Sequence, residues 1–242
     1  MNLFRGPRNI YVRRITLGAI VGSCLVIAAI WFFTGTKSNA AMAIIPVPQD
    51  GASSEGDNPA ATGHVVRDKR FLSAEEIKSR FPAEMHEEFM RRAIANSHKA
   101  GVQYKTGGAF GAVIVSKDGE VLADGVNHVI AQNDPTWHAE MHAIRQACAL
   151  MKSPKLDGCI LYTSSEPCPM CLATAYWAGL DGIVYGATVA DSSKYGNFDD
   201  GFIYEQFSKP VADRAISEQE MLRPEAVEVW KEYQAREDKV AY

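Results

Sequence analysis

Two short segments of the chain carry side chains that could hold a metal ion and move a proton. The segment PTWHAE supplies His138 and Glu140, and the segment EPCPMC supplies Cys168 and Cys171 about thirty residues later. One histidine and two cysteines suit zinc, and three protein ligands leave its fourth position open, as in catalytic zinc sites. We therefore predict that His138, Cys168 and Cys171 bind one zinc ion per subunit.

Glu140 is the expected proton carrier of this site. Zinc lowers the pKa of a bound water to about 7, and the reaction then needs a base that takes the proton and delivers it to a leaving group. A zincin-type site at His138 and His142 is disfavoured, because it needs glutamate directly after its first histidine, where Ala139 stands. The combination of H-x-E with P-C-x-x-C is instead the signature of zinc-dependent nucleobase deaminases.

Both metal-binding segments are predicted at helix N-termini. Asp134 and Pro135 suit the cap and the first position of a helix over 135–151, and Pro167 suits the start of a helix over 167–178. A helix N-terminus carries partial positive charge, which lowers the pKa of a thiol and favours a metal-bound thiolate. Two such helices side by side on one face of a sheet would bring the three ligands together.

The elements around these helices indicate an α/β fold. Apolar runs bounded by turn residues predict strands, with Asp118-Gly119 joining the first two as a hairpin. The expected strands are 111–115, 121–126, 159–164 and 183–186, and the further expected helices are 84–100, 224–237 and a short helix opened by a capping box at Ser73–Glu76. Because helix then strand repeats in the later part of the chain, the later strands should be parallel. We expect a three-layer α/β/α sandwich around a mixed five-stranded sheet.

Residues 1–43 are predicted to be a signal peptide or a membrane anchor. The run from Ile15 to Phe33 has no charge, follows four arginines and is long enough to span a bilayer, while small residues up to Ala43 permit cleavage. Residues 44–66 are rich in Pro, Gly and Ser and are expected to form a flexible linker. The zinc-binding domain should therefore span 67–242 and lie in the cell envelope, outside the cytoplasm.

Composition argues against a nucleic-acid partner and against a fold built on disulfides. All 29 acidic residues lie from Asp50 onward together with 20 of the 25 basic ones, so this part has a net charge of −9. Binding to a phosphate backbone depends on clustered Lys and Arg. Cys148 and Cys159 are expected to be buried free thiols, because five cysteines in 242 residues do not make a disulfide framework.

The metal-binding segments and their neighbours resemble the cytidine deaminase-like superfamily, and within it they are most similar to bacterial guanine deaminases. The resemblance runs from about Glu84 to Tyr242. It is carried by GGAFGAV at 107–113, NDPTWHAE at 133–140, ILYTSSEPCPMC at 160–171 and FDDGFIY at 198–204. The last segment is similar to guanine deaminases and unlike the tRNA adenosine deaminases, which share the zinc motifs.

The resemblance implies hydrolysis of guanine to xanthine and ammonia. It implies that Asn127 hydrogen-bonds the base, that Phe110 stacks on it, that Asp200 assists proton transfer near the leaving amino group, and that Tyr242 closes the pocket. In that family the C-terminal segment crosses to the partner subunit, so a domain-swapped homodimer is implied. The alternatives are that Phe110 is strand core, that Asp200 caps a helix and that Tyr242 is a loose terminus.

Three features depart from the guanine deaminase pattern. Trp137 stands where a small residue is usual and either contacts the substrate or packs behind the pocket, Asn197 is an apparent insertion before Phe198, and the N-terminal segment is foreign to the family. These departures leave open another small substrate, such as a nucleoside, a cytosine-type base or an aminotriazine, and also tRNA adenosine. The non-enzymatic alternative is an envelope protein with a purely structural zinc site, which would need a fourth protein ligand.

Overall fold

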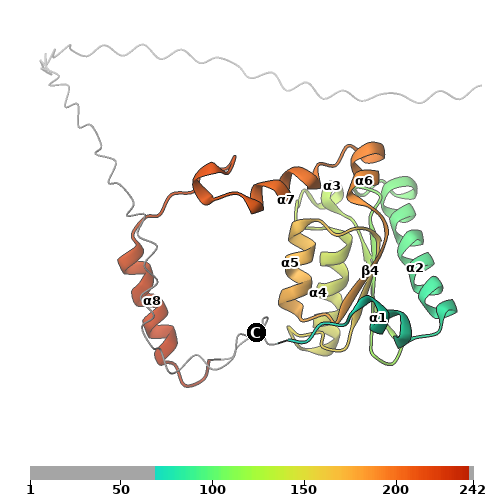
Figure 1. The fold of residues 1–242 in the computed structure, drawn as a ribbon, viewed down its shortest axis with the longest axis horizontal. Helices are drawn as coiled ribbons and strands as arrows, with labels where there is room; N and C mark the ends of the chain where they lie inside the picture. Colours follow the sequence, from blue (N-terminus) through green and yellow to red (C-terminus); the bar gives the residue numbers. More distant parts are fainter. Residues whose placement is uncertain (1–68, 240–242) are drawn as a thin grey trace, which may run out of the picture. The chain divides into compact units, whose positions relative to one another are not determined.

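A four-stranded mixed sheet forms the centre of the fold in the computed structural model, which describes residues 69–239 (Figure 1). The strand order is β2-β1-β3-β4, with β1 antiparallel to both β2 and β3, and β3 parallel to β4. The strands are β1 (Gly111–Val115), β2 (Val121–Val126), β3 (Ile160–Ser165) and β4 (Gly182–Ala187). The mixed sheet and the parallel later pair were predicted, but the predicted count of five was wrong for the described residues. After β4 a capping box between Thr188 and Asp191 starts a helix.

Short-range sequence features explain most element bounds. The β1–β2 hairpin turns at Asp118-Gly119, and Gly119 has a φ of +83°, a conformation that favours glycine. Ser73 closes the predicted capping box with Glu76. The helices are α1 (Ala74–Arg80), α2 (Ala83–His98) with a π-helical turn at Lys99–Gln103, α3 (Val129–Gln132), α4 (Ala139–Met151), α5 (Pro169–Ala178), α6 (Val189–Gly196), α7 (Asp200–Ser208), a 3-10 turn at Val211–Asp213, and α8 (Arg223–Ala235).

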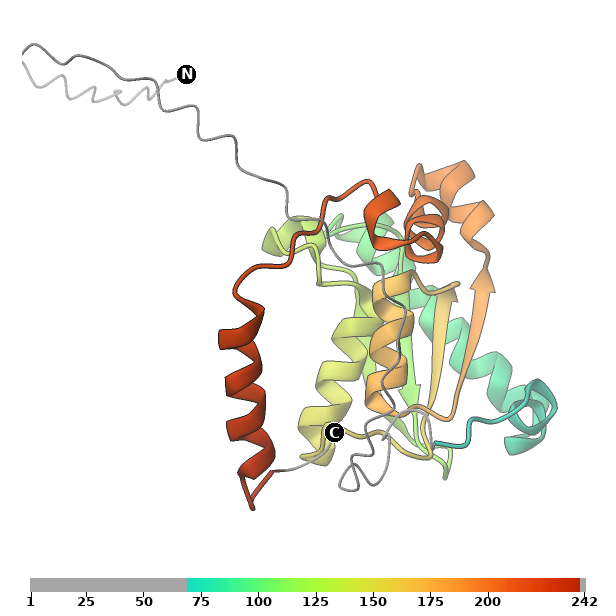
Figure 2. The same cartoon turned by 60° about the vertical axis from the view of Figure 1, so that its left-hand side comes forward.

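Helices cover both faces of the sheet. Along β1, alternate side chains enter different cores: Val113 and Val115 pack with Phe89 of α2, whereas Ala112 and Ile114 pack with the α4 and α5 side. Figures 1 and 2 show α2 on one side of the sheet and α4 and α5 on the other. The expected α/β sandwich is therefore present, and α4 and α5 lie side by side as the metal site requires.

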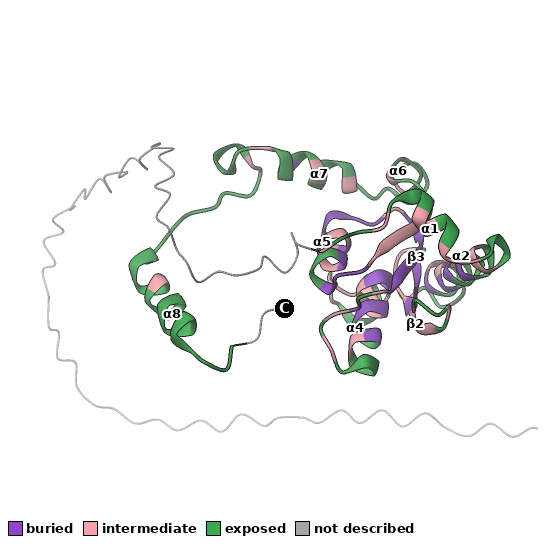
Figure 3. Ribbon diagram, turned by 60° about the horizontal axis from the view of Figure 1, so that its bottom comes forward, coloured by how far each residue is buried: buried purple, intermediate pink, exposed green. Residues whose placement is uncertain are grey.

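The C-terminal part of the described chain is exposed, in contrast to the sheet. No residue of α8 is buried (Figure 3). Val229 and Trp230 are 65% and 70% exposed. Among residues 69–239 no helix has the length and apolar character needed to cross a bilayer. The expected signal or anchor at 1–43, the expected linker at 44–66 and the C-terminal Tyr242 lie outside the described residues.

Candidate active site

The three predicted zinc ligands converge. The Sγ atoms of Cys168 and Cys171 each lie 3.5 Å from Nδ1 of His138, and the three ligand atoms lie within 4.8 Å of one another. His138 is the N-cap of α4, Cys168 is the N-cap of α5, and Cys171 lies in the first turn of α5. The adjacent N-terminal ends of α4 and α5 therefore assemble the group from segments that are distant in sequence.

Both helices begin later than predicted. The helix expected from Pro135 starts at Ala139, because Asp134 closes a tight turn instead: its Oδ1 accepts from the backbone N–H of Thr136 at 2.8 Å, and its carbonyl accepts from that of Trp137 at 3.1 Å. The helix expected from Pro167 starts at Pro169. Helix α4 thus begins directly after His138, and α5 begins directly after Cys168.

The His138, Cys168 and Cys171 group fits a zinc ion chemically. A hydrogen bond with Cys171 and the neighbouring His138 imidazole lower the pKa of Cys168 to about 4. The hydrogen bond with Cys168 and burial raise the pKa of Cys171. Two sulfurs and an imidazole nitrogen this close are a donor set that zinc prefers, and within residues 69–239 the metal-binding group contains these three residues alone. A closed structural site would need a fourth ligand, so the group favours a catalytic site.

Glu140 lies beside this group in the second position of α4. Its side chain is buried, with 3% of the residue exposed, and burial raises the pKa of its carboxyl group. The hydroxyl of Thr163 donates a hydrogen bond to Oε1 of Glu140 at 3.3 Å. Sequence reasoning missed Thr163, because it is one of three successive polar residues that follow the apolar part of β3 and nothing local singles it out. The arrangement gives a carboxyl group suited to proton transfer next to the metal site.

A pocket of about 350 Å³ opens onto Glu140 and the metal ligands. Besides His138, Glu140 and Cys168, the structure brings three predicted substrate contacts into its wall: Phe110, Asn127 and Asp200. Glu166 and Phe198 also line it and were not predicted as site residues, although both belong to the motif segments. Residues from five separate stretches therefore meet in one cavity.

Asn127 is held in a defined orientation within this pocket. It is 3% exposed, and its Oδ1 accepts a hydrogen bond from the backbone N–H of Val129 at 3.1 Å. This bond uses the side-chain oxygen, so the amide nitrogen is the atom that can donate to a ligand.

Asp200 reaches the pocket because its neighbour performs the capping role. Oδ1 of Asp199 accepts from the backbone N–H of Phe202 at 3.2 Å, so Asp199 caps α7 and Asp200 is its first residue. Burial raises the pKa of Asp200. Asn197, the apparent insertion, adopts the left-handed conformation (φ 59°) at the end of α6, which asparagine tolerates, and the turn it makes leads directly to Phe198.

Trp137 lies outside the active-site pocket. Its ring packs against the rings of His128 and His142 at centroid distances of 6.0 and 5.7 Å, and it is not among the residues that line the pocket. Of the two roles considered for Trp137, its position matches packing behind the metal ligand and not contact with the substrate.

Comparisons with known proteins place these features in a family. The family described as the cytidine and deoxycytidylate deaminase zinc-binding region matches residues 83–187. Guanine deaminase from Bacillus subtilis is 50% identical over 131 residues, which are 54% of this chain and 82% of the relative. The tRNA-specific adenosine deaminase of Agrobacterium fabrum is 35% identical over 127 residues, or 52% of this chain and 78% of that protein.

A solved structure agrees with the sequence comparison. The X-ray structure of guanine deaminase from Bacillus subtilis superposes with a TM-score of 0.62 at 42% identity, and the match covers 65% of this chain and 98% of that chain.

Proposed function

The chain belongs to the cytidine and deoxycytidylate deaminase family of zinc-binding enzymes, and from this premise we propose that it hydrolyses guanine to xanthine and ammonia. The observation that carries the proposal is the buried Glu140 beside the converging His138, Cys168 and Cys171, in a pocket that also holds Asn127. The 50% identity to a guanine deaminase supports guanine as the substrate.

Different residues of the pocket bind the metal and transfer protons in this reaction. His138, Cys168 and Cys171 would hold one zinc ion per subunit, and bound zinc supplies Lewis acidity that activates water at neutral pH. Glu140 takes a proton from the water and passes it to the amino group that leaves as ammonia. Asp200, which also lines the pocket, assists this transfer.

Two further side chains of the pocket hold the base. Phe110 stacks on its ring, and the side-chain amide nitrogen of Asn127 donates a hydrogen bond to one of its acceptors. Neither contact needs a charge, which suits a neutral purine.

A substrate panel tests the proposal. The purified protein should release ammonia from guanine, and Glu140→Ala should abolish the release while zinc content stays unchanged. Guanine left intact while adenine, cytosine, guanosine or an aminotriazine is consumed would reject the substrate and keep the reaction class. Full activity of Glu140→Ala would reject the mechanism.

A tRNA adenosine deaminase is the second candidate, because such enzymes are also relatives of this chain. The −9 net charge from Asp50 onward opposes binding to a phosphate backbone, and the pocket wall carries the carboxyl groups of Glu140, Glu166 and Asp200. Inosine formation in tRNA by the purified protein, with no ammonia released from guanine, would favour this candidate.

We also propose that the C-terminal segment, through Tyr242, closes the pocket of a second copy in a domain-swapped homodimer. The exposed apolar side chains of Val229 and Trp230 on α8 support a partner for this helix. Light scattering should give twice the 26.5 kDa chain mass, and a variant ending at residue 210 should be a monomer. A full-length monomer would reject the swap.

Finally, we propose that residues 1–43 place the enzyme in the cell envelope, either uncleaved as a membrane anchor or removed as a signal. The uncharged run behind four arginines supports export. Fractionation of cells that carry a tagged full-length chain tests the location, and recovery of the tag in the cytosol alone would reject it.

A further inference from the structure

A second cavity, here called the rear cavity, lies next to the active-site pocket. Its volume is about 490 Å³. Its wall includes Ser164 and Ser165 at the end of β3, Ala187 at the end of β4, and Ser192 and Gly196 of α6. The ends of two parallel strands and the following helix thus line a space that the proposed reaction does not use.

Two aromatic rings separate the two cavities. Phe110 and Phe198 are the residues that line both, and their rings meet edge to face with centroids 4.9 Å apart and an interplanar angle of 73°. The pair is therefore a partition: one side faces Glu140 and the metal ligands, and the other faces the serines of the rear cavity.

Two glycines allow Phe198 to sit in this partition. A Cβ added at Gly108 would lie 2.7 Å from each of the two aromatic rings, and a Cβ added at Gly196 would lie 2.6 Å from the ring of Phe198. Such distances are shorter than real side chains tolerate, so the backbone at both glycines approaches the ring closely and leaves room for it only because no Cβ is present.

The rear cavity has the chemistry of a site for a neutral group with hydroxyls. Ser165 is 4% exposed, and its Oγ lacks a hydrogen-bond partner within the described chain, which is unfavourable for a buried hydroxyl unless a ligand pairs with it. Among the described residues the wall contains no Lys or Arg, and its one acid, Asp191, already accepts hydrogen bonds from the backbone N–H and the hydroxyl of Thr188. A phosphate is disfavoured there, and a pentose is suited to it.

We propose that Phe198 is a specificity residue that restricts the enzyme to a free purine base, and that the rear cavity is a latent site for the sugar of a purine nucleoside. The inference rests on the proposed guanine deaminase activity. With the partition in place, the pocket holds the base alone. With Phe198 shortened, the two cavities join and the base can be held while its pentose occupies the space beside Ser165.

The test compares guanine with guanosine. In Phe198→Ala, the ratio of kcat/KM for guanosine to kcat/KM for guanine should rise at least about tenfold, which matches the discrimination that one or two lost contacts provide. Adding Ala187→Leu, at an exposed position that lines only the rear cavity, should refill the space and reverse the gain with guanosine. Zinc content and thermal unfolding show that the variants are folded.

The outcomes distinguish failure of the Phe198 partition from failure of the proposed guanine deaminase activity. Phe198→Ala that still deaminates guanine with an unchanged ratio would overturn the partition, as would a wild-type enzyme that already accepts guanosine as well as guanine. A wild-type protein inactive on guanine would instead refute the proposed function. If Phe198→Ala does not fold, Phe198→Val decides: a smaller rise in the same ratio supports the partition, and a constant ratio overturns it.

Discussion

The hydroxyl of Tyr204 donates a hydrogen bond to the carbonyl oxygen of Pro167 at 2.8 Å, and so joins α7 to the residue before the metal ligand Cys168. Tyr204 and Asp200 are four residues apart on α7 and share one face of the helix. Burial and nearby negative charge raise the pKa of Tyr204 to about 12, so its hydroxyl remains a donor at neutral pH. This bond positions the helix that presents Asp200 to the pocket.

Tyr204→Phe should lower kcat/KM for guanine by about 3–10-fold, the equivalent of one hydrogen bond, through loss of the correct placement of Asp200. Zinc content should not change, because Tyr204 does not belong to the metal-binding group of His138, Cys168 and Cys171. Tyr176→Phe is the matched control, since its ring packs on Phe71 near the other end of α5. Equal kinetics of Tyr204→Phe and the control would contradict a positioning role.

Thr163→Val removes the hydroxyl that donates to Oε1 of Glu140 but keeps the shape of the side chain. We expect kcat to fall by about tenfold with little change in KM, because the bond orients a proton carrier and does not touch the base. Thr163→Ser should recover most of the activity. A loss confined to KM, or one that serine does not rescue, would show that Thr163 acts only through packing.

Cys171→Ala should lose zinc and all activity, because two ligands hold zinc poorly compared with three. Dialysis of the wild type against 1,10-phenanthroline should inactivate it, and added zinc should restore it, as metal analysis and ammonia release will show. Cys148→Ala is the control, since Cys148 is a half-buried free thiol on the far part of α4. Retention of zinc by Cys171→Ala would point to a different ligand set.

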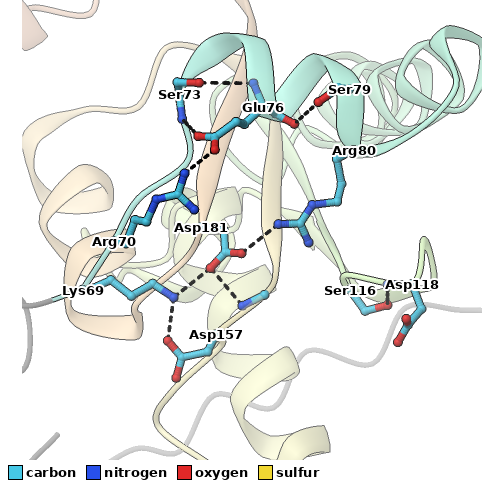
Figure 4. Close-up of polar contacts among 11 residues, drawn as sticks. Lys69, Arg70, Ser73, Glu76, Ser79, Arg80, Ser116, Asp118, Asp157 and Asp181 are labelled. Atoms are coloured by element: carbon cyan, nitrogen blue, oxygen red, sulfur yellow. Dashed lines mark hydrogen bonds and ion pairs between the residues drawn. The ribbon is translucent and has the colours of Figure 1, made fainter.

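A charged cluster fastens the start of the domain to the sheet (Figure 4). Oδ1 of Asp181 accepts from Nζ of Lys69 at 2.7 Å and from the backbone N–H of Gly158 at 3.0 Å, and Oδ2 accepts from Arg80 at 3.1 Å. Lys69 also donates to Asp157 at 2.7 Å. The Lys69 and Asp181 side chains are only 16% and 13% exposed, so solvent screens this pair incompletely.

Asp181→Asn should therefore lower the free energy of unfolding by about 1–3 kcal/mol, because charged hydrogen bonds are lost and Lys69 is left with one partner. Urea denaturation measures the change. Glu87→Gln is the control, since it breaks an exposed ion pair with Arg91 and should change stability by less than about 0.5 kcal/mol. Equal effects of the two substitutions would show that the cluster adds no stability.

The contribution of the cluster should depend on pH. Burial would raise the pKa of Asp181, but hydrogen bonds from Lys69, Gly158 and Arg80 outweigh it and hold the pKa below its usual value. A carboxyl group with a lowered folded-state pKa stabilises the fold above its unfolded-state pKa of about 3.9, and the stabilisation is lost as the pH falls through the folded-state pKa. The stability difference between wild type and Asp181→Asn should be constant from about pH 5 to 8 and shrink towards pH 3. A difference that persists unchanged in acid would contradict this account.

The sequence by itself determined the parts of the protein that depend on neighbouring residues. The H-A-E and C-P-M-C spacings predicted which side chains converge as candidate metal ligands beside Glu140, since each pair lies within one helical turn of its partner. The Ser73–Glu76 capping box and the hairpin at Asp118-Gly119 formed as predicted for the same reason, because their geometry is set within four residues.

Only the tertiary structure decided the contacts that join distant segments. Thr163 reaches Glu140, Tyr204 reaches Pro167, and Phe198 reaches Phe110 across 23, 37 and 88 positions respectively, and no local pattern encodes which side chains meet over such separations. Local sequence patterns also fail to decide between two neighbouring residues or between two directions of one side chain. Asp199 and not Asp200 caps α7, and Trp137 packs on His142 away from the pocket. Both results follow from how each chain segment enters its helix. Spacing along the chain therefore predicted the chemistry of the site, while packing between elements shaped the pocket around it.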